Sequence, residues 1–290
     1  MILHIGCKVN LHLALKAVRP DGYHELSTLF VPVAQPHDDL EIEPRDGTGL
    51  TLTCSDKALE TPSNLAAKAY EAFAQATGSR PGVRAHLIKR IPSGAGLGGG
   101  SADAAALLAW LNARAGERAL APKALATLAA SIGADVPFFL LDRPAWASGI
   151  GERLVPADVD LAGLFILVCV PPQRVNTAWA YRAWDAANGL DRERPGPNPA
   201  PALPEGLEAA LAAGRVLAND FEPVVYREFP DVRRLKERLL ALGAAGACLS
   251  GSGSAVFGLF REKAASELAE EALADGGFMV FASALQPPRP

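Results

Sequence analysis

A glycine-rich run limits the possible folds and functions of this chain more than any other feature of its sequence. The run spans residues 92–101 and reads Pro-Ser-Gly-Ala-Gly-Leu-Gly-Gly-Gly-Ser. It follows an apolar stretch that predicts a strand and precedes an alanine- and leucine-rich stretch that predicts a helix. Backbone N–H groups in such a run can converge on an anion, and the helix N-terminus adds positive partial charge. The run therefore predicts a phosphate-binding loop; the alternative is a tight connection in which glycine only permits positive φ.

Two familiar phosphate-binding motifs fit this run poorly. Its glycines formally match the dinucleotide fingerprint G-x-G-x-x-G, but Glu117, at the spacing of the ribose-binding acid, falls after the predicted end of the helix. A Walker A loop needs Gly-Lys-Ser/Thr, whereas Gly100 precedes Ser101 here. The glycine match alone is weak support for an NAD-dependent oxidoreductase. Positive charge for the phosphates must come from Mg²⁺ or from elsewhere in the chain, and Lys8 is a candidate.

Length and composition indicate a folded protein of about two domains. The chain has 290 residues, 49% of them hydrophobic and 21% charged, so a wholly disordered chain is excluded. A net charge of −4 argues against a nucleic-acid partner, although a nucleotide ligand stays possible. The cysteines are far apart and form no C-x-x-C pair, which favours reduced thiols over a disulfide framework or a zinc site. They are Cys7, Cys54, Cys169 and Cys248.

The N-terminus has no basic leader followed by a long apolar stretch, and the longest apolar run, Leu161–Val170, is shorter than the roughly 20 residues of a spanning helix. We therefore expect a cytoplasmic protein with no membrane partner. A domain boundary is predicted near residue 157, which gives domains 1–157 and 158–290. The proline-rich, charged stretch at 191–205 predicts an exposed, mobile loop.

Apolar periodicity predicts the main helices and strands. Residues 9–15 alternate between apolar and other residues, so Lys8, Asn10 and His12 share one face of a strand. A second extended stretch at 26–33 is followed by a polar break at 36–39. Helices are predicted at 62–76, 101–115 and 122–132. The second half has a strand-helix-strand-strand-helix-strand order, with its ordered elements near 161–170, 231–242, 247–249, 255–260, 263–274 and 278–284.

Several polar side chains allow both a structural and a functional interpretation. Asp135 precedes Val-Pro-Phe-Phe, so it is either an ordinary helix N-cap or a group that orients a substrate hydroxyl and accepts its proton. Lys8 and Asn10 are either the solvated face of an edge strand or part of a site. Tyr23 and His24 follow an Asp-Gly turn, and such a pair can stack on and hydrogen-bond a planar ring.

Taken together, the motifs resemble those of the GHMP kinase superfamily. Three occur in the family's order: Cys-Lys-Val-Asn at 7–10, the glycine run extended to Asp103, and Leu-Ser-Gly-Ser-Gly-Ser-Ala-Val-Phe at 249–257. Within the superfamily, Asp-Gly-Tyr-His at 21–24 and Gly-Ala-Asp-Val-Pro-Phe-Phe at 133–139 resemble the kinases of a cytidine-diphosphate-linked methylerythritol. The similarity extends over almost the whole chain.

This resemblance implies an α+β, two-domain fold, with a ribosomal-protein-S5-like N-terminal domain and a ferredoxin-like C-terminal domain. It implies ATP-dependent phosphorylation of the 2-hydroxyl of the cytidine compound, a small-molecule substrate, in the non-mevalonate route to isoprenoid precursors. Mg²⁺ is expected with ATP, but the sequence indicates neither its ligands nor the oligomeric state. The alternatives are another kinase of the superfamily, of mevalonate or homoserine type, or a nucleotide-binding sensor without catalysis.

The resemblance also implies roles for individual residues. Asp135 would be the catalytic carboxylate, with Lys8 close to it, lowering its pKa and polarising the hydroxyl. Asn10 would hydrogen-bond the substrate, and cytosine would be held by Tyr23, His24 and, from the second domain, Tyr181. The ATP phosphates would be bound by Pro92, Ser93, Gly94, Ala95, Gly96, Leu97, Gly98, Gly99, Gly100, Ser101 and Ala102. The phosphate side would be closed by Ser250, Gly251, Ser252 and Gly253.

Two positions depart from the family pattern. Cys7 stands where alanine is usual, which places a thiol near the expected site. Ala178 and Trp179 follow Thr177 where proline is frequent, so the wall facing cytosine is expected to differ.

Overall fold

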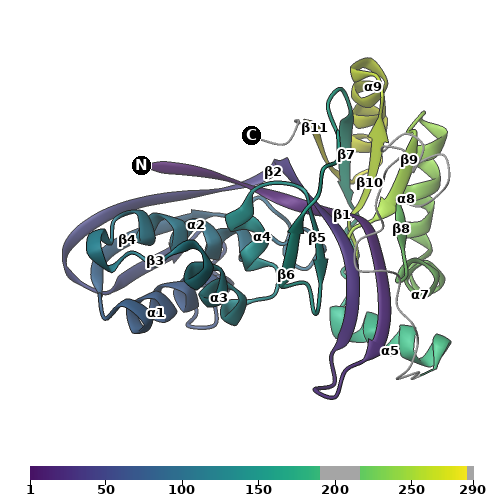
Figure 1. Cartoon of the computed structure of the whole chain (residues 1–290). Helices are drawn as coiled ribbons and strands as arrows, with labels where there is room; N and C mark the ends of the chain where they lie inside the picture. The colour runs from purple at the N-terminus through teal and green to yellow at the C-terminus, as the bar shows by residue number, and fades with distance from the viewer. Residues whose placement is uncertain (190–215, 286–290) are drawn as a thin grey trace. The chain divides into compact units, whose positions relative to one another are not determined.

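The computed structural model describes residues 1–189 and 216–285, and the loop predicted at 191–205 lies outside this range. The chain forms two compact units, shown with their helices and strands in Figure 1. The strands β1 (Ile2–Val18) and β2 (His24–Thr48) contribute to both units, because each passes from one unit to the other along its length. Unit 1 contains Met1–Cys7, Pro36–Ser93 and Gly98–Asp142, and unit 2 contains Lys8–Gln35, Gly94–Leu97 and Arg143–Pro290.

Unit 1 combines a sheet with a layer of helices. The second half of β2 pairs antiparallel with β4 (Pro81–Ile88), and β3 (Leu50–Cys54) pairs parallel with β4. Their apolar side chains share one buried core with those of α1 and α2. The helical elements are η1 (Lys57–Leu59), α1 (Leu65–Thr77), α2 (Gly99–Ala113), η2 (Gly116–Arg118), α3 (Pro122–Ile132) and α4 (Val136–Leu141).

Local sequence explains where the helices of unit 1 begin and end. Asn64 caps α1, since its side chain accepts the Ala66 N–H at 2.9 Å, and Gly78 ends the helix at a φ of 65°. The predicted helix at 122–132 is confirmed with the same bounds. The helix predicted from Ser101 begins two residues earlier, at Gly99, because Gly98 adopts the left-handed conformation from which the helix starts.

Unit 2 contains a four-stranded antiparallel sheet in the order β11-β7-β10-β9, formed by β7 (Phe165–Val170), β9 (Gly246–Leu249), β10 (Val256–Phe260) and β11 (Met279–Ala284). Numbered within this sheet the order is 4-1-3-2, which is the ferredoxin-like arrangement that was expected. The helices α8 (Pro230–Ala241) and α9 (Lys263–Ala274) pack on this sheet through a common core (Figure 1). Over residues 143–189 and 216–285, the unit also contains β5 (Ala145–Ser148), β6 (Arg153–Pro156), α5 (Thr177–Asn188), β8 (Ala218–Asn219) and α7 (Glu222–Glu228).

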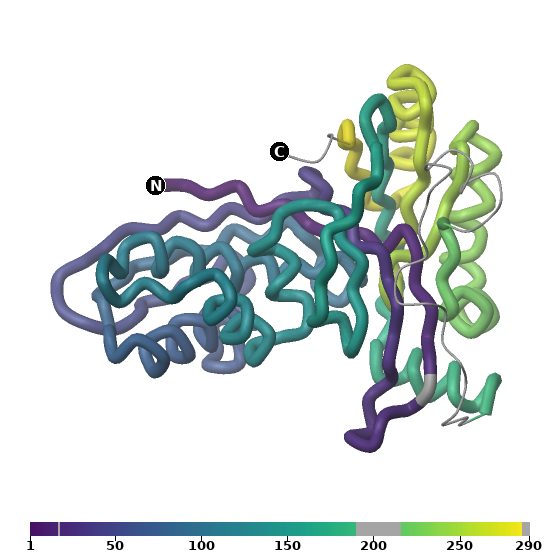
Figure 2. The backbone as a smooth tube through the Cα atoms, viewed as in Figure 1, coloured from purple at the N-terminus to yellow at the C-terminus, as the bar shows by residue number. Residues whose placement is uncertain are grey.

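Residues 8–35 of the β1–β2 hairpin belong to unit 2, and the two strands are joined by a tight turn (Figure 2). Arg19 N donates to Tyr23 O at 2.7 Å, and Gly22, at a φ of 84°, donates to Arg19 O at 3.0 Å. The Asp-Gly turn predicted here is confirmed. Consequently Tyr23 lies at the tip of the hairpin and is 62% exposed.

The polar break predicted at residues 36–39 is wrong, because β2 continues through it as a single strand. The polar side chains that suggested the break have partners in unit 1. Asp38 contacts Lys89, and Asp39 contacts His4 and Arg90. These contacts give the polar side chains the partners that water would supply in an exposed loop.

All four cysteines are free, as their spacing predicted, and all four are buried. Over residues 1–189 and 216–285, we find no helix whose length and apolar character would let it cross a membrane.

Candidate active site

Lys8 and Asn10 lie inside unit 2, with 4% and 2% of their surfaces exposed. The interpretation of this face as solvated is therefore wrong. Lys8 Nζ donates to Asn10 Oδ1 at 2.8 Å, and Asn10 Nδ2 donates to Thr28 Oγ1 at 2.7 Å. Lys8 Nζ also lies 5.0 Å from the centre of the Phe30 ring. This network fixes a buried ammonium group, and burial strengthens its electrostatic effect on any anionic group that approaches.

The middle of the glycine loop, residues 94–97, contacts both of the other predicted motifs of unit 2. Leu97 O accepts the backbone N–H of Lys8 at 3.0 Å. Gly96 O accepts the Ser250 hydroxyl at 3.0 Å, and Ser250 Oγ lies 3.5 Å from Asn10 Oδ1. Three segments that are far apart in the sequence are thus brought together.

Glycine is required at position 96 for two reasons. Its φ is 80°, and a Cβ there would collide with the Ser250 carbonyl oxygen. Gly94 and Gly98 also have positive φ, at 72° and 75°. Alternating left-handed residues turn successive N–H groups toward the same side, which is the geometry of an anion-binding nest.

Asn219 supports the segment Ser250–Gly253. Its Nδ2 donates to Leu249 O and to Gly251 O, both at 2.8 Å. Thr177 Oγ1 lies 2.9 Å from Ser252 Oγ, which fixes the other side of the segment. The sequence analysis missed Asn219, because it belongs to no motif and its partners are about 30 positions away.

The end of the glycine loop forms the first turn of α2 in unit 1. Ala102 N donates to Gly98 O at 3.0 Å, which is the first helical hydrogen bond. The N–H groups before it belong to the helix terminus that has no partners inside the helix, and no side chain caps it. This terminus can therefore bind a phosphate through residues 99–101.

Asp135 occupies the N-cap position of α4 in unit 1, but its side chain makes no capping hydrogen bond. The side chain is half-buried. Gly133 lies beside the first turn of α2, since a Cβ there would be 3.9 Å from Ser101 Oγ. Asp135 is thus part of a segment that lies beside the N-terminal end of α2, and its side chain lacks the hydrogen bond that the capping interpretation predicts.

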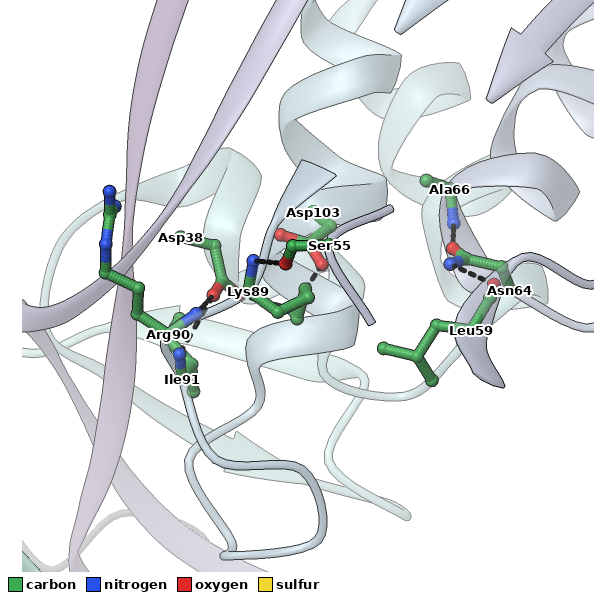
Figure 3. Close-up of polar contacts among 9 residues, drawn as sticks. All are labelled: Asp38, Ser55, Leu59, Asn64, Ala66, Lys89, Arg90, Ile91 and Asp103. Atoms are coloured by element: carbon green, nitrogen blue, oxygen red, sulfur yellow. Dashed lines mark hydrogen bonds and ion pairs between the residues drawn. The ribbon is translucent and has the colours of Figure 1, made fainter. Parts of the chain in front are cut away.

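A buried ion cluster of unit 1 ties together the two ends of the glycine loop (Figure 3). Lys89 Nζ contacts Asp38 Oδ2 and lies 2.6 Å from Asp103 Oδ2. Asp38 Oδ1 accepts the backbone N–H groups of Arg90 and Ile91 at 2.6 and 2.9 Å. Lys89 lies before the loop and Asp103 lies in α2 after it, so the cluster fixes both ends of the loop.

Burial changes the pKa values in this cluster. It raises the pKa of Asp103 to about 7, against the opposing attraction of Lys89. Burial also opposes the charge on Lys89, but the carboxylates of Asp103 and Asp38 outweigh it and raise the pKa of that ammonium group. Asp103 ends the glycine-run motif, but its ion pair, and the roles of Asp38 and Lys89, were not predicted, because only the folded chain brings positions 38, 89 and 103 together.

The residues predicted to bind cytosine lie partly in an aromatic cluster of unit 2. The His24 ring stacks on Tyr181, with ring centres 4.9 Å apart and planes inclined by 28°, and meets Trp184 edge-on. His24 Nε2 lies 2.7 Å from Asp185 Oδ1. The structure therefore brings two of the predicted residues together, and α5 supplies two further residues, Trp184 and Asp185, that the sequence analysis did not identify.

Two family models match the chain: the GHMP kinases N terminal domain over residues 64–143, and the GHMP kinases C terminal domain over residues 200–277. A protein of Solidesulfovibrio magneticus named 4-diphosphocytidyl-2-C-methyl-D-erythritol kinase is 52% identical over 278 residues, covering 95% of this chain and 94% of the relative. A protein of the same name from Nitratidesulfovibrio vulgaris is 44% identical, with 96% of both chains covered.

Solved structures show the same similarity. A crystal structure of 4-(cytidine 5'-diphospho)-2C-methyl-D-erythritol kinase is 38% identical, with a TM-score of 0.78 over 97% of this chain and 98% of that one. A homoserine kinase from Cytophaga hutchinsonii, 20% identical with a TM-score of 0.67, covers 97% of this chain and 96% of its own and shares the fold. Since relatives well above 30% identity cover nearly the whole chain, it belongs to the GHMP kinases and, among them, to the 4-diphosphocytidyl-2-C-methyl-D-erythritol kinase family.

Proposed function

We propose that this chain transfers the γ-phosphoryl group of ATP to the 2-hydroxyl of 4-diphosphocytidyl-2-C-methyl-D-erythritol, giving the 2-phosphate and ADP in the non-mevalonate route to isoprenoid precursors. The observation that carries the proposal is the contact of the buried Lys8–Asn10 pair with the glycine loop and Ser250. A sensor needs to bind nucleotide but has no use for a buried ammonium group beside a phosphate loop. ATP as the donor follows from membership of the kinase family.

Phosphoryl transfer depends mainly on positioning and on stabilising charge. The substrate oxygen forms a bond to the γ-phosphorus while the bond between that phosphorus and the β,γ-bridging oxygen breaks, and ADP leaves. We assign Asp135 as the acceptor of the hydroxyl proton and Lys8 as the cation that stabilises the reacting oxygens. Asn10, which already holds Lys8 at 2.8 Å, would also orient the substrate.

The ATP phosphates are assigned to Pro92–Ala102, with Ser250–Gly253 closing their side. Mg²⁺ would neutralise phosphate charge. The hydroxyl of Ser101, in the first turn of α2, is an oxygen ligand of the kind that Mg²⁺ accepts, with phosphate oxygens and water as further ligands.

The cytosine ring is assigned to Tyr23, His24 and Tyr181. His24 Nε2 donates a hydrogen bond to the Asp185 carboxylate, so Nδ1 is the ring nitrogen that can accept one. The exocyclic amine of cytosine is a suitable donor to Nδ1. Stacking on Tyr181 fixes the plane of the histidine ring. We further propose that the sequence boundary between the family's two domains lies near residue 157, and that the enzyme acts in the cytoplasm, on a small molecule and without a nucleic-acid or membrane partner.

The test is ADP release by the purified chain with ATP and Mg²⁺, comparing the cytidine compound with mevalonate, homoserine and galactose. Turnover confined to the cytidine compound supports both the reaction and the cytosine site. Turnover of another alcohol would keep the kinase assignment and reject this substrate. ATP binding with no turnover of any of the four would favour a sensor.

A further inference from the structure

Two histidines and an aspartate gather on β1 and β2 in unit 1, in a group that the proposed reaction does not use. Met1 and Ile42 exchange both backbone hydrogen bonds, each at 2.9 Å. This register places His4 opposite Asp39, at a position where the strands exchange no hydrogen bonds and side chains approach most closely. His37 lies two residues from Asp39 on β2, so both side chains emerge on the same face of the strand.

The donor atoms of the three side chains converge. His4 Nδ1 and His37 Nε2 lie 2.7 and 3.2 Å from the same oxygen, Asp39 Oδ1. One ligand atom from each of the three residues falls within 4.8 Å of the others. The two imidazole rings stand edge to face, with centres 5.2 Å apart.

We propose that His4, His37 and Asp39 bind one divalent transition-metal ion of the Zn²⁺ type. Zinc bonds of about 2.0–2.2 Å in tetrahedral geometry separate neighbouring donors by about 3.3 Å. His4 Nδ1 and His37 Nε2, at 2.7 and 3.2 Å from Asp39 Oδ1, are within about 0.6 Å of this separation, so small side-chain rotations would bring them to it. Two imidazoles and a carboxylate form a common three-ligand zinc set, and water takes the fourth position. Access is open, because the His4 side chain is 71% exposed.

Arg90 limits which metals can bind. Its guanidinium group contacts Asp39 Oδ2, so Oδ1 is the carboxylate oxygen that remains for a metal. The positive charge of this group opposes any cation, so a hard ion such as Mg²⁺ or Ca²⁺, which prefers several oxygen ligands, is disfavoured. Metals with strong affinity for imidazole, such as Zn²⁺, Co²⁺ and Cu²⁺, are favoured.

The competing explanation is that the two histidines only hydrogen-bond the shared carboxylate. Calorimetric titration of the untagged full chain with Zn²⁺, without ATP or Mg²⁺, separates the two explanations. The absorption spectrum of bound Co²⁺ then reports coordination by nitrogen. We expect one equivalent to bind, with affinity reduced at least tenfold in H4Q and in H37Q.

His86 provides a matched control in the same unit. It is a half-buried histidine on β4 that lies opposite Glu41 of β2, and its Nδ1 pairs with Thr53 Oγ1 at 2.8 Å, so it is not one of the three proposed ligands. H86Q should bind Zn²⁺ as the parent chain does. Kinase turnover within twofold of the parent in H4Q and H37Q would show that both variants are folded. Unchanged Zn²⁺ affinity in either variant, or an equal loss in H86Q, would overturn the proposal.

Discussion

The proposed proton transfer from the substrate hydroxyl depends on the carboxylate of Asp135. D135N keeps the size of the side chain and removes the group that accepts the proton. Because a positioned general base contributes about 10²–10⁴-fold, we expect kcat to fall by about 10³-fold. ATP affinity should stay within twofold, since the phosphates are assigned to other residues. Steady-state ADP release and calorimetric ATP binding measure both quantities, and near-normal turnover would remove Asp135 from the mechanism.

Tyr23 tests the cytosine site at the same scale. The ring is 62% exposed at the hairpin tip, so its removal leaves no cavity in the core. Loss of stacking on a base costs about 1–3 kcal/mol, which predicts that the KM of Y23A for the cytidine substrate rises roughly 5- to 150-fold. The KM for ATP should not change. Y23F retains the ring and should behave like the parent, and an equal change in both KM values of Y23A would contradict stacking.

Lys89 tests the buried ion cluster. K89M removes the cation from two carboxylates that are almost fully buried, Asp38 and Asp103. Breaking a buried ion pair on one side costs about 3–5 kcal/mol, so urea unfolding should show a loss of that size. K57M breaks an exposed pair with Glu60 and should cost less than about 1 kcal/mol. Equal losses in the two variants would show that burial does not govern the cluster.

The site residues that could be predicted are those that lie in short sequence motifs. Lys8, Asn10 and the glycine run occur in short motifs whose spacing carries their meaning, and the structure brings these motifs together in unit 2. Lys89 stabilises the glycine loop, and Asn219 stabilises the segment Ser250–Gly253, each through partners that are distant in the sequence. A single charged or amide residue has no local signal that separates such a role from solvent exposure.

At the scale of elements, β2 shows how tertiary contacts override local signals. Pro36 and the polar residues after it predict a break, yet the strand extends from His24 to Thr48. Asp38 is fully buried because Lys89 and two backbone N–H groups satisfy its carboxylate. The helix at 122–132 was predicted with its observed bounds, because Pro122 and Gly133 are local start and stop signals.

The glycine loop is the element on which ATP binding is proposed to depend. G96A places a methyl group against the Ser250 carbonyl oxygen, whereas a Cβ at Gly94 meets no atom within 4 Å. Both glycines have a similar positive φ, so replacement by alanine should cost each variant the same backbone strain, about 1–2 kcal/mol. We expect the KM for ATP to rise at least tenfold more in G96A than in G94A, measured by ADP release. Equal effects would mean that backbone conformation, and not contact with Ser250, controls the loop.

For the whole molecule, the order of elements was more predictable than their division into units. The strand-helix-strand-strand-helix-strand order after residue 160 was predicted from the sequence pattern, and the resemblance to the GHMP kinases implied the ferredoxin-like sheet, whose strands have the order 4-1-3-2. No local pattern indicates that residues 8–35 and 94–97 belong to the same unit as residues 143–290. That grouping comes from contacts distant in sequence, such as Lys8 N to Leu97 O.

The stability of the whole molecule should depend on pH through Asp103. Its pKa is raised by burial to about 7, so the folded chain binds this proton more tightly than the unfolded chain does. The stabilisation from protonated Asp103 is complete below the carboxyl group's ordinary pKa of about 4 and is lost as pH rises through about 7. The free energy of unfolding of the parent, minus that of D103N, should therefore fall between pH 4 and pH 7 and level off above pH 8.

Urea unfolding at several pH values measures this difference. D46N, which removes an exposed carboxylate of β2, supplies the baseline for losing one acidic group. Lys89 lies 2.6 Å from Asp103, and its ammonium group favours the ionised form of that carboxyl group. K89M removes the ammonium group, so the decline should move to higher pH. A difference curve that rises between pH 4 and 7 would show that the attraction of Lys89 outweighs burial, and Asp103 would then be ionised throughout the neutral range.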